Sequence, residues 1–409
     1  MNQPLTVNAD RLHASLADLA QIGATPAGGV TRLALSDEDR QARDLLSTWL
    51  RDAGLEPKVD DVGNISAIRP GRESAPPVLL GSHIDTVVRG GRYDGALGVL
   101  GALEVIRTLD DHGIETRLPI GLVNWTNEEG VRFEPAMTCS GVVTGRFTPE
   151  YVGERTDRAG LRFADELARI GYQGDAANRS LPASAYLELH IEQGPVLESQ
   201  NLPAGVVGGI VGITWNEVTI AGQADHAGPS PMGLRRDALT AAAEIILGVE
   251  QIAKRRDETA VATVGRIAAQ PNVINTIPGQ VVFSVDFRHS DPAILEQQVA
   301  ALHQLVDEVA TRRSVEATIE RFWTSEPTPF DTRVQDAIRL SAAALGVSTG
   351  ELWSGAGHDA KYLADVCPTG MIFVRSQGGL SHCEAEYSAP ADIEAGANLL
   401  LNAAINLAG

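Results

Sequence analysis

The amino-acid sequence predicts an α/β protein of two domains, in which a smaller domain is inserted into a larger one. Strand-like apolar runs alternate with helical patterns along most of the 409 residues, which is typical of an α/β sheet. From residue 212 to 325 the order of the elements changes to βαββαβ. We therefore predict one domain from residues 1–211 and 326–409, and a second from residues 212–325.

The composition is that of an acidic globular protein, with 44% apolar and 21% charged residues. A net charge of -20 disfavours nucleic acid and anionic membranes as partners, because both select basic surfaces. No apolar run approaches the ~18 residues of a membrane helix. The N-terminus has no signal-peptide pattern, and the three cysteines lack metal-type spacing. We expect a cytoplasmic protein with reduced thiols.

The larger domain contains four strand-like runs that end in polar residues. Helical patterns lie between them, as at 95–110 and 156–170. Because ligands of open α/β sheets bind beyond the carboxyl ends of the strands, we expect the polar ends to lie near one another. The runs are "PPVLLGSHID" (76–85), "LPIGLVNWTNEEG" (118–130), "AYLELHIEQG" (185–194) and "TGMIFVRSQGGLSH" (369–382).

The smaller domain begins with the alternating strand pattern "ITWNEVTIAG" and a helical pattern over 233–255. Two strands, "TAVATVGRIAA" and "GQVVFSVDFRH", are joined by the turn-rich "QPNVINTIP". Asp291 and Pro292 are typical of an N-cap and the first position of a helix. That helix has one apolar stripe, formed by Leu295, Val299, Leu302, Val306 and Val309. With the last strand, "SVEATIERFW", the order is that of a split ferredoxin-like unit.

Eight of the nine histidines fall into two kinds. Four stand alone and are expected to be surface or packing residues: His13, His112, His289 and His303. Four lie in dense polar motifs of the larger domain: His83, His190, His358 and His382. Repulsion and desolvation disfavour acid-flanked histidine clusters unless cations bind them. We therefore predict a metal site at the strand ends.

The stretch "HID" suggests how one metal-binding histidine is oriented. In a strand, His83 and Asp85 point to the same face, so the carboxylate of Asp85 is expected to accept a hydrogen bond from the far nitrogen of His83. Asp94 follows in a Gly-rich turn and has two oxygens that can bridge two cations. A carbamylated lysine is a poor competitor for that role, because the chain has only three lysines.

Glu128 and Glu129 are adjacent at a strand end, so their side chains diverge. One can bind metal while the other takes a proton from water. A solvated acidic turn would be the preferred interpretation of "EE" alone. Beside "HID", "LHIEQG" and "GLSH" that interpretation is disfavoured.

Eight motifs in this order resemble those of the dinuclear-metal amidohydrolases, a family that includes N-carbamoyl-L-amino-acid hydrolases, allantoate amidohydrolases, ureidoglycolate amidohydrolases and β-ureidopropionases. Each string is weak alone, but the ordered set is specific and extends from about residue 35 onward. The motifs are "GSHIDTVVRGGRYDGALG", "TNEEGVRF", "ELHIEQGPVLE", "GQADHAGPSPMGLRRDA", "PNVINTIPG", "VDFRH", "SGAGHDA" and "GLSHCEAEYS".

The resemblance implies two divalent metal ions per subunit, bridged by Asp94. His83 and His190 would complete one site, and Glu129 and His382 the other, with Glu128 as general base. Zn²⁺ is the usual ion of the family, and Mn²⁺, Co²⁺ or Ni²⁺ often substitute, because ligand type does not discriminate among them. The implied fold is a zinc-aminopeptidase-like catalytic domain with an inserted ferredoxin-like domain, which acts as a lid and forms a homodimer.

The resemblance also implies substrate contacts. His226 would reach the active site of the partner subunit and polarise the scissile carbonyl. Asn275 and Arg288 would hold the substrate carboxylate, for which Arg is suited. Gln193 would contact the ureido group, and His358 would line the pocket.

Departures from the family pattern affect substrate choice rather than mechanism. They are Arg375 in place of a proline, Cys383 after the ligand histidine, and Pro229 and Ser230 in place of threonines.

The expected reaction is hydrolysis of the linear C–N amide bond of a ureido group on a small carboxylate, with N-carbamoyl-L-amino acids as the favoured substrates. Allantoate, ureidoglycolate and N-carbamoyl-β-alanine remain alternatives, as does a metallopeptidase or deacylase that uses the same metal centre. A binding protein on this scaffold is disfavoured, because every proposed ligand and Glu128 are present. A cyclic-hydantoin hydrolase is disfavoured as well, because it would resemble a barrel with a carbamylated lysine.

Overall fold

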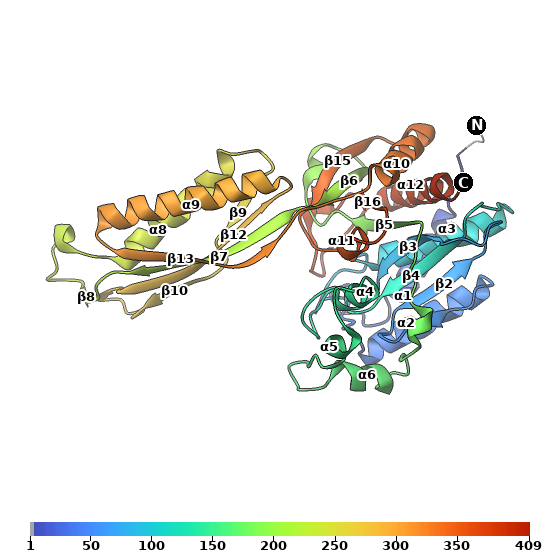
Figure 1. The fold of residues 1–409 in the computed structure, drawn as a ribbon, viewed down its shortest axis with the longest axis horizontal. Coiled ribbons are helices and arrows are strands. Elements are labelled where there is room, and N and C mark those ends of the chain that lie inside the picture. Colours follow the sequence, from blue (N-terminus) through green and yellow to red (C-terminus); the bar gives the residue numbers. More distant parts are fainter. Residues whose placement is uncertain (1–3) are drawn as a thin grey trace. The chain divides into compact units, whose positions relative to one another are not determined.

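The structure, a computed structural model, describes residues 4–409 and forms two compact units (Figure 1). Unit 1 comprises the chain up to Gly209 and from Pro329 onward, and unit 2 comprises Ile210–Thr328. The chain therefore leaves unit 1 once, forms unit 2 and returns.

Unit 1 contains a mixed sheet in the order β1-β2-β4-β3-β5-β16-β6-β14, with β15 paired to β6. β3 is parallel to β4 and β5, and β5 is parallel to β16, whereas the outer pairs β2–β4 and β16–β6 are antiparallel. The strands are Lys58–Val59 (β1), Ile65–Arg69 (β2), Val78–His83 (β3), Ile120–Trp125 (β4), Ala185–Ile191 (β5), Ala204–Ile210 (β6), Thr328–Pro329 (β14), Thr349–Ser354 (β15) and Thr369–Val374 (β16). The predicted α/β class is confirmed.

The four central strands, β3, β4, β5 and β16, are buried along their whole length. This explains their continuous apolar pattern, since a strand covered on both faces has no polar side. Helices α3 and α12 pack against each other and against these strands. The α-helices of unit 1 are Ala9–Leu19 (α1), Asp37–Asp52 (α2), Ala96–Asp111 (α3), Thr138–Val143 (α4), Pro149–Gly153 (α5), Phe163–Arg169 (α6), Val196–Ser199 (α7), Thr332–Leu345 (α10), Ala360–Leu363 (α11) and Pro390–Ala408 (α12).

The helix predicted over 156–170 is shorter than expected and begins only at Phe163. The residues before it form a turn, in which the carboxylate of Asp157 accepts the backbone N–H groups of Ala159 and Leu161. Gly160 takes a φ of 80° in this turn. A local side-chain cap therefore competes successfully with the helical pattern there.

Unit 2 is an antiparallel sheet in the order β10-β12-β7-β13, with β9 also paired to β12. Helices α8 and α9 pack against each other and contact β12 and β7, around a core that includes Val218, Phe283 and Phe287. The strands are Gly212–Ala221 (β7), Val261–Thr263 (β9), Ile267–Gln270 (β10), Gln280–His289 (β12) and Glu316–Ser325 (β13), and the helices are Ala238–Lys254 (α8) and Pro292–Arg313 (α9).

Two details of unit 2 differ from the sequence prediction. The run "TAVATVGRIAA" forms two short strands, β9 and β10, rather than one. The residues predicted as a plain turn contribute β11 (Thr276–Ile277), which pairs with β8 (Asp225–His226). The start of α9 is as predicted, because the side chain of Asp291 accepts the N–H of Ala293.

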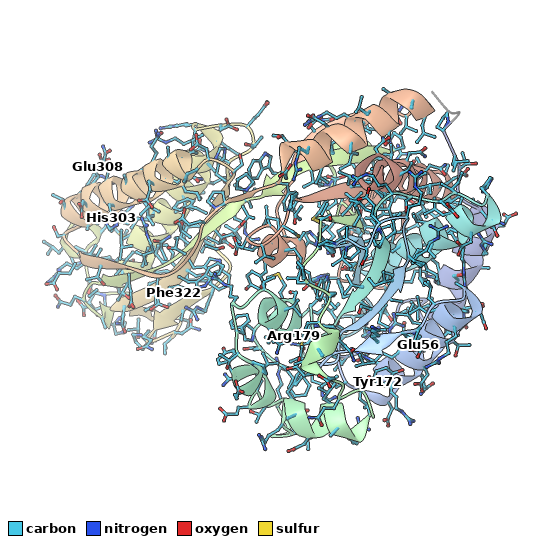
Figure 2. The ribbon with its side chains drawn as sticks, turned by 45° about the vertical axis from the view of Figure 1, so that its right-hand side comes forward. Glu56, Tyr172, Arg179, His303, Glu308 and Phe322 are labelled. Carbon is cyan, nitrogen blue, oxygen red and sulfur yellow. The ribbon has the colours of Figure 1, made fainter. Side chains whose placement is uncertain are left out.

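The surface of unit 2 carries His303, which is exposed on α9 as expected of a solitary histidine (Figure 2). His289 is instead a packing residue, 4% exposed, whose ring nitrogen lies 3.1 Å from the hydroxyl of Thr259. Among the described residues, no helix is both long and apolar enough to cross a bilayer.

Candidate metal centre

Parallel strand ends bring the predicted ligands to one edge of the unit 1 sheet. His83 is the last residue of β3, and Glu128 and Glu129 follow β4, its parallel neighbour. His190 lies near the end of β5, which is parallel to both β3 and β16. His382 lies beyond the end of β16. The four polar ends therefore meet, as expected for the carboxyl edge of a parallel segment.

Asp94 lies at the centre of this cluster. Its Oδ1 is 3.1 Å from Nε2 of His190 and 3.6 Å from Nε2 of His83. Its Oδ2 is 3.3 Å from Nε2 of His382, which is also 3.5 Å from Oε2 of Glu129. The two oxygens of one carboxylate thus face two different sets of donor atoms.

The described residues contain three groups whose donor atoms lie within 4.8 Å of one another and could hold a metal ion. Two of them share Asp94 and contain the ligands that the sequence predicted: His83, Asp94 and His190, and Asp94, Glu129 and His382. The third is Glu188, His190 and His358, which shares His190 with the first.

The backbone around these residues adopts unusual conformations. Asn127, Gln193 and His382 all have φ between 55° and 60°, in the left-handed region that side-chain-bearing residues rarely adopt. Gly95, at the start of α3, has a φ of 63°, and a Cβ there would overlap the ring of His83. Such strain is typical of functional sites that the surrounding fold holds in place.

Asp85 is held differently from the sequence prediction. The Nδ1 of His83 lies 2.9 Å from the backbone carbonyl of Asp85, whereas the carboxylate is 3.9 Å away. The alternation argument fails because β3 ends at His83. The carboxylate of Asp85 instead accepts the backbone N–H groups of Glu128 and Glu129, each at 3.3 Å. Asp85 therefore fixes the turn that carries the paired glutamates.

The site concentrates acidic groups in a buried place. Burial raises the pKa of Glu128 well above its usual range, and the charges of Asp359 and Glu129 add to the effect. Burial and the charge of Asp94 likewise raise the pKa of Glu129. Burial lowers the pKa of His190, but its hydrogen bond with Asp94 and the charges of Asp94 and Glu188 together outweigh this and raise the pKa to about 9.

These donors fit a pair of divalent cations. Imidazole nitrogens and carboxylate oxygens are the ligands that Zn²⁺ and similar metals take in proteins. Oε1 of Glu129 is buried and has no hydrogen-bond partner in the structure. A bound cation would supply the missing partner and offset the cost of gathering buried carboxylates.

Glu386 belongs to this site, although sequence reasoning did not single it out. Its Oε1 accepts the backbone N–H groups of Tyr93 and Asp94 at 3.1 and 3.2 Å, and its Oε2 accepts the hydroxyl of Ser381 at 3.0 Å. Glu386 is 5% exposed, and a Cβ on Gly91 would overlap its carboxylate. Its place in the same motif as His382, "GLSHCEAEYS", was the available signal.

Gln193 and His358 both lie against the ligands. Nε2 of Gln193 donates to Oδ2 of Asp94 at 2.9 Å, while its Oε1 is buried without a partner. The ring of His358 packs edge-on against that of His190, with centroids 4.5 Å apart, and its Nε2 lies 2.9 Å from the hydroxyl of Ser354.

Of the three predicted substrate residues of unit 2, His226 and Asn275 lie side by side, whereas Arg288 lies apart from them. His226 pairs with Thr276 across β8 and β11, so Asn275 lies beside it, and the carbonyl of Asn275 accepts the N–H of Ala227 at 3.0 Å. Arg288 lies near the far end of β12, which starts at Gln280. Eight residues of extended strand span about 26 Å. One small substrate therefore cannot touch both Arg288 and the His226–Asn275 pair of a single unit 2.

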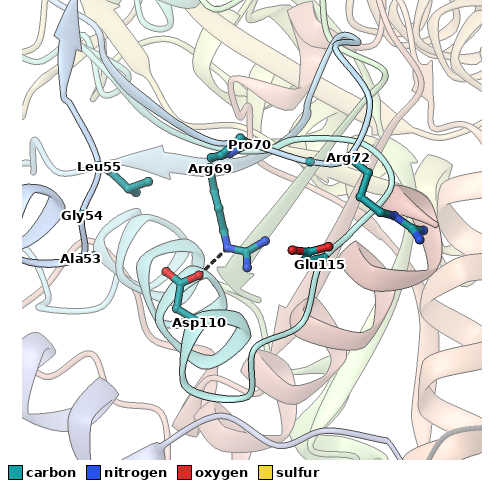
Figure 3. A pocket seen from close by; sticks show the side chains of 9 residues that line it. Ala53, Gly54, Leu55, Arg69, Pro70, Arg72, Asp110 and Glu115 are labelled. Atoms are coloured by element: carbon teal, nitrogen blue, oxygen red, sulfur yellow. Dashed lines mark hydrogen bonds and ion pairs between the residues drawn. The ribbon is translucent and has the colours of Figure 1, made fainter.

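A cavity of ≈ 490 Å³ lies elsewhere in unit 1 and shares no residue with the cluster (Figure 3). It is lined by Arg69, whose Nε donates to Asp110 at 2.7 Å, and by Glu115 nearby. Arg69 ends β2, which is antiparallel to β4, so the cavity lies at the sheet edge opposite the ligands.

Comparisons with known proteins agree over nearly the whole chain. The profile described as peptidase family M20/M25/M40 matches residues 79–406. An N-carbamoyl-L-amino-acid amidohydrolase of Rhizobium meliloti is 44% identical, covering 98% of this chain and 97% of that protein. An N-carbamoyl-L-amino acid amidohydrolase of Geobacillus stearothermophilus is 42% identical, covering 98% of this chain and 99% of that protein. The crystal structure of a hydantoinase/carbamoylase family amidase from Burkholderia ambifaria has a TM-score of 0.96 at 44% identity, covering 100% and 99%.

Proposed function

The chain belongs to peptidase family M20/M25/M40, and from this premise we propose that it hydrolyses the linear C–N amide bond of the ureido group of N-carbamoyl-L-amino acids. The resemblance that the ordered motifs predicted is confirmed. The structural observation that supports a two-metal hydrolase is the position of Asp94, whose two oxygens face two sets of donor atoms. The choice of substrate rests on the similarity to N-carbamoyl-L-amino-acid amidohydrolases.

Two divalent ions would be held by this cluster, one by His83, Asp94 and His190, and one by Asp94, Glu129 and His382. Divalent metals act as Lewis acids and lower the pKa of bound water. Asp94 supplies one oxygen to each set, and Gln193 and Ser381 hydrogen-bond the oxygen that faces His382. Zn²⁺ suits the donors, and Mn²⁺, Co²⁺ or Ni²⁺ suit them as well.

Glu128 is the general base of the proposed reaction. Its Oε2 lies 3.6 Å from Nε2 of His83, yet Glu128 belongs to neither of the two ligand sets that share Asp94. Its carboxylate would take a proton from water and return it to the leaving nitrogen. Asp85 acts as a positioning residue, since it holds the backbone of Glu128 and Glu129.

The substrate contacts of the proposal are those that the resemblance implies. Arg288 binds the substrate carboxylate together with Asn275, Gln193 offers Oε1 to a ureido N–H group, and His226 polarises the carbonyl. The separation of His226 from Arg288 along β12 supports a homodimer, in which His226 and Asn275 come from the partner subunit. His358 would line the pocket beside His190. Unit 2 is then a ferredoxin-like lid and dimerisation domain, inserted into a zinc-aminopeptidase-like catalytic domain of a cytoplasmic enzyme.

The deciding experiment measures ammonia release by the Mn²⁺-reconstituted protein. The panel contains N-carbamoyl-L-amino acids, N-carbamoyl-β-alanine, allantoate and ureidoglycolate, with N-acetyl amino acids and dipeptides assayed for free amine. Ammonia from the N-carbamoyl-L-amino acids is the expected result. Amine release from acylated or peptidic compounds alone would contradict the proposal and favour a deacylase or peptidase.

A further inference from the structure

The face of the unit 2 sheet opposite α8 and α9 carries a cluster of exposed aromatic side chains, which we call the aromatic cluster. Trp215 of β7 and Phe322 and Trp323 of β13 have 38%, 48% and 41% of their surface exposed. The ring centroid of Trp215 lies 4.5 Å from that of Trp323 and 6.1 Å from that of Phe322. Figure 2 shows Phe322 across the sheet from α9. Grouped exposed aromatic rings mark sites of binding.

A bulge in β13 builds this cluster. Arg321 pairs with Asn216, and the next pair is Trp323 with Trp215, so Phe322 is an extra residue in its strand. Because of the bulge, two consecutive aromatic side chains reach Trp215 instead of pointing to opposite faces. Bulges re-aim side chains and are over-represented beside functional sites.

A cation lies beside the cluster on the same face. Trp215 pairs with Asp286 of β12, and the carboxylate of Asp286 accepts Nη2 of Arg288 at 2.7 Å. Asp286 and Arg288 are two positions apart and so share a face. A diagonal neighbour across two strands is roughly 7 Å away, which places the guanidinium within reach of a ligand that covers the rings.

We propose that the aromatic cluster binds the large apolar or aromatic side chain of the substrate whose carboxylate Arg288 holds. This inference rests on the proposed function and narrows it to the N-carbamoyl derivatives of aromatic and large aliphatic L-amino acids. Allantoate, ureidoglycolate and N-carbamoyl-β-alanine carry a ureido group and a carboxylate but no apolar side chain. These substrates would leave the rings uncovered, so the aromatic cluster would add nothing to their binding.

A small carboxylate fits this face better than a second copy of the chain. Glu217 and Glu320 lie directly opposite each other on β7 and β13, close to the rings, and among the described residues Arg266 pairs with Glu217 only. A second copy bound on this face would add its own Glu320 carboxylate to the first. A small ligand with one carboxylate can contact Arg288 and the rings without covering the two glutamates.

The test compares kcat/KM for N-carbamoyl-L-phenylalanine and N-carbamoylglycine on the Mn²⁺-loaded protein. Trp323→Ala and Trp215→Ala are expected to lower the ratio of the two values about tenfold, as the loss of one aromatic contact predicts. Trp323→Phe keeps a ring and should preserve most of the ratio. Leu247→Ala removes an exposed apolar side chain of α8 and is the matched control.

An unchanged ratio in Trp323→Ala and Trp215→Ala would overturn the proposal, even if both rates fall. A shift of Trp323→Ala from dimer to monomer in sedimentation, with the ratio unchanged, would instead identify the face as an interface between copies.

Tryptophan fluorescence separates failure of the subsite from failure of the proposed function. If the wild-type protein releases no ammonia from either compound, the proposed function is wrong. Saturable quenching by N-carbamoyl-L-phenylalanine, absent in Trp323→Ala and weaker with N-carbamoylglycine, would still support the subsite. Equal quenching by both compounds would contradict it.

Discussion

At the scale of single residues, it was easier to predict which side chains gather at the site than how each one is oriented there. The candidate ligands stood out in the sequence because histidines flanked by carboxylates at strand ends are unfavourable without a cation. The sequence could not show whether His83 contacts the carboxylate or the backbone carbonyl of Asp85, because this depends on where β3 ends. Glu386 was missed for a related reason: its partners, Tyr93 and Asp94, are distant in sequence and meet it only in the fold.

Glu128→Gln tests the proton-transfer role. Glutamine keeps the shape of the side chain but cannot accept the proton, so turnover should fall by at least about a hundredfold. Metal content, measured by elemental analysis, should stay at the wild-type value. Loss of metal together with activity would make Glu128 a ligand and refute the assignment.

Arg288→Ala tests the carboxylate contact. A charge-assisted hydrogen bond is worth about 1.5–3 kcal/mol, so KM should rise about tenfold to a hundredfold while kcat changes little. Arg266→Ala, which removes a cation paired with Glu217 in the same unit, is the control and should leave KM near the wild-type value. An unchanged KM in Arg288→Ala would show that the carboxylate binds elsewhere.

At the scale of elements, hydrophobic periodicity predicted those helices and strands whose position is determined by their own sequence. The central strands and α3 lie in the core of unit 1, and α9 packs its apolar stripe on the separate core of unit 2, where their patterns placed them. The β8–β11 pair and the bulge in β13 were not predicted, because both arise from pairing between segments distant in the chain. The helix predicted over 156–170 was wrong in its first residues, because the carboxylate of Asp157 accepts two backbone N–H groups and so favours a turn.

Glu386 accepts two backbone N–H groups of the loop that carries Asp94, and the effect of this contact on metal affinity can be measured without turnover. Glu386→Ala should weaken metal affinity about tenfold to a hundredfold, as the loss of a group that orients a ligand predicts. Glu386→Gln retains an oxygen for the two backbone N–H groups and should stay close to wild type. Isothermal titration of the metal-free protein with Zn²⁺ gives the affinities.

Gly91→Ala tests the same contact by displacing Glu386 rather than removing it. A methyl group there would displace the Glu386 carboxylate, so this variant should reproduce the defect of Glu386→Ala. The double variant should be no worse than either single one. Glu394→Ala, on the exposed side of α12, is the control. Full metal affinity in Gly91→Ala would show that the loop does not need Glu386.

At the scale of the whole molecule, the change in element order predicted an inserted domain over 212–325, and the structure forms a compact unit over Ile210–Thr328. The association of chains cannot be read from one chain. The relation between His226 and Arg288 needed the structure, because it depends on the length of β12.

Mixing two inactive variants tests whether catalysis crosses between subunits. In a hybrid of Glu128→Gln and His226→Ala subunits, the His226→Ala chain keeps its own Glu128 and would receive His226 from its partner. One site of each hybrid should therefore work, and random exchange of subunits should restore about a quarter of wild-type activity. No recovery after verified subunit exchange would place His226 in its own chain's site.

The separation of Arg288 from His226 in unit 2 bears on how activity depends on the amount of protein in the cell. If one chain supplies Arg288 to one reaction and His226 to another, as proposed, a solitary copy would be inert. While copies are scarce, the number of complete sites would then grow with the square of the amount synthesised, by simple mass action. Output would then respond to gene dosage steeply at low expression and proportionally once the copies are paired.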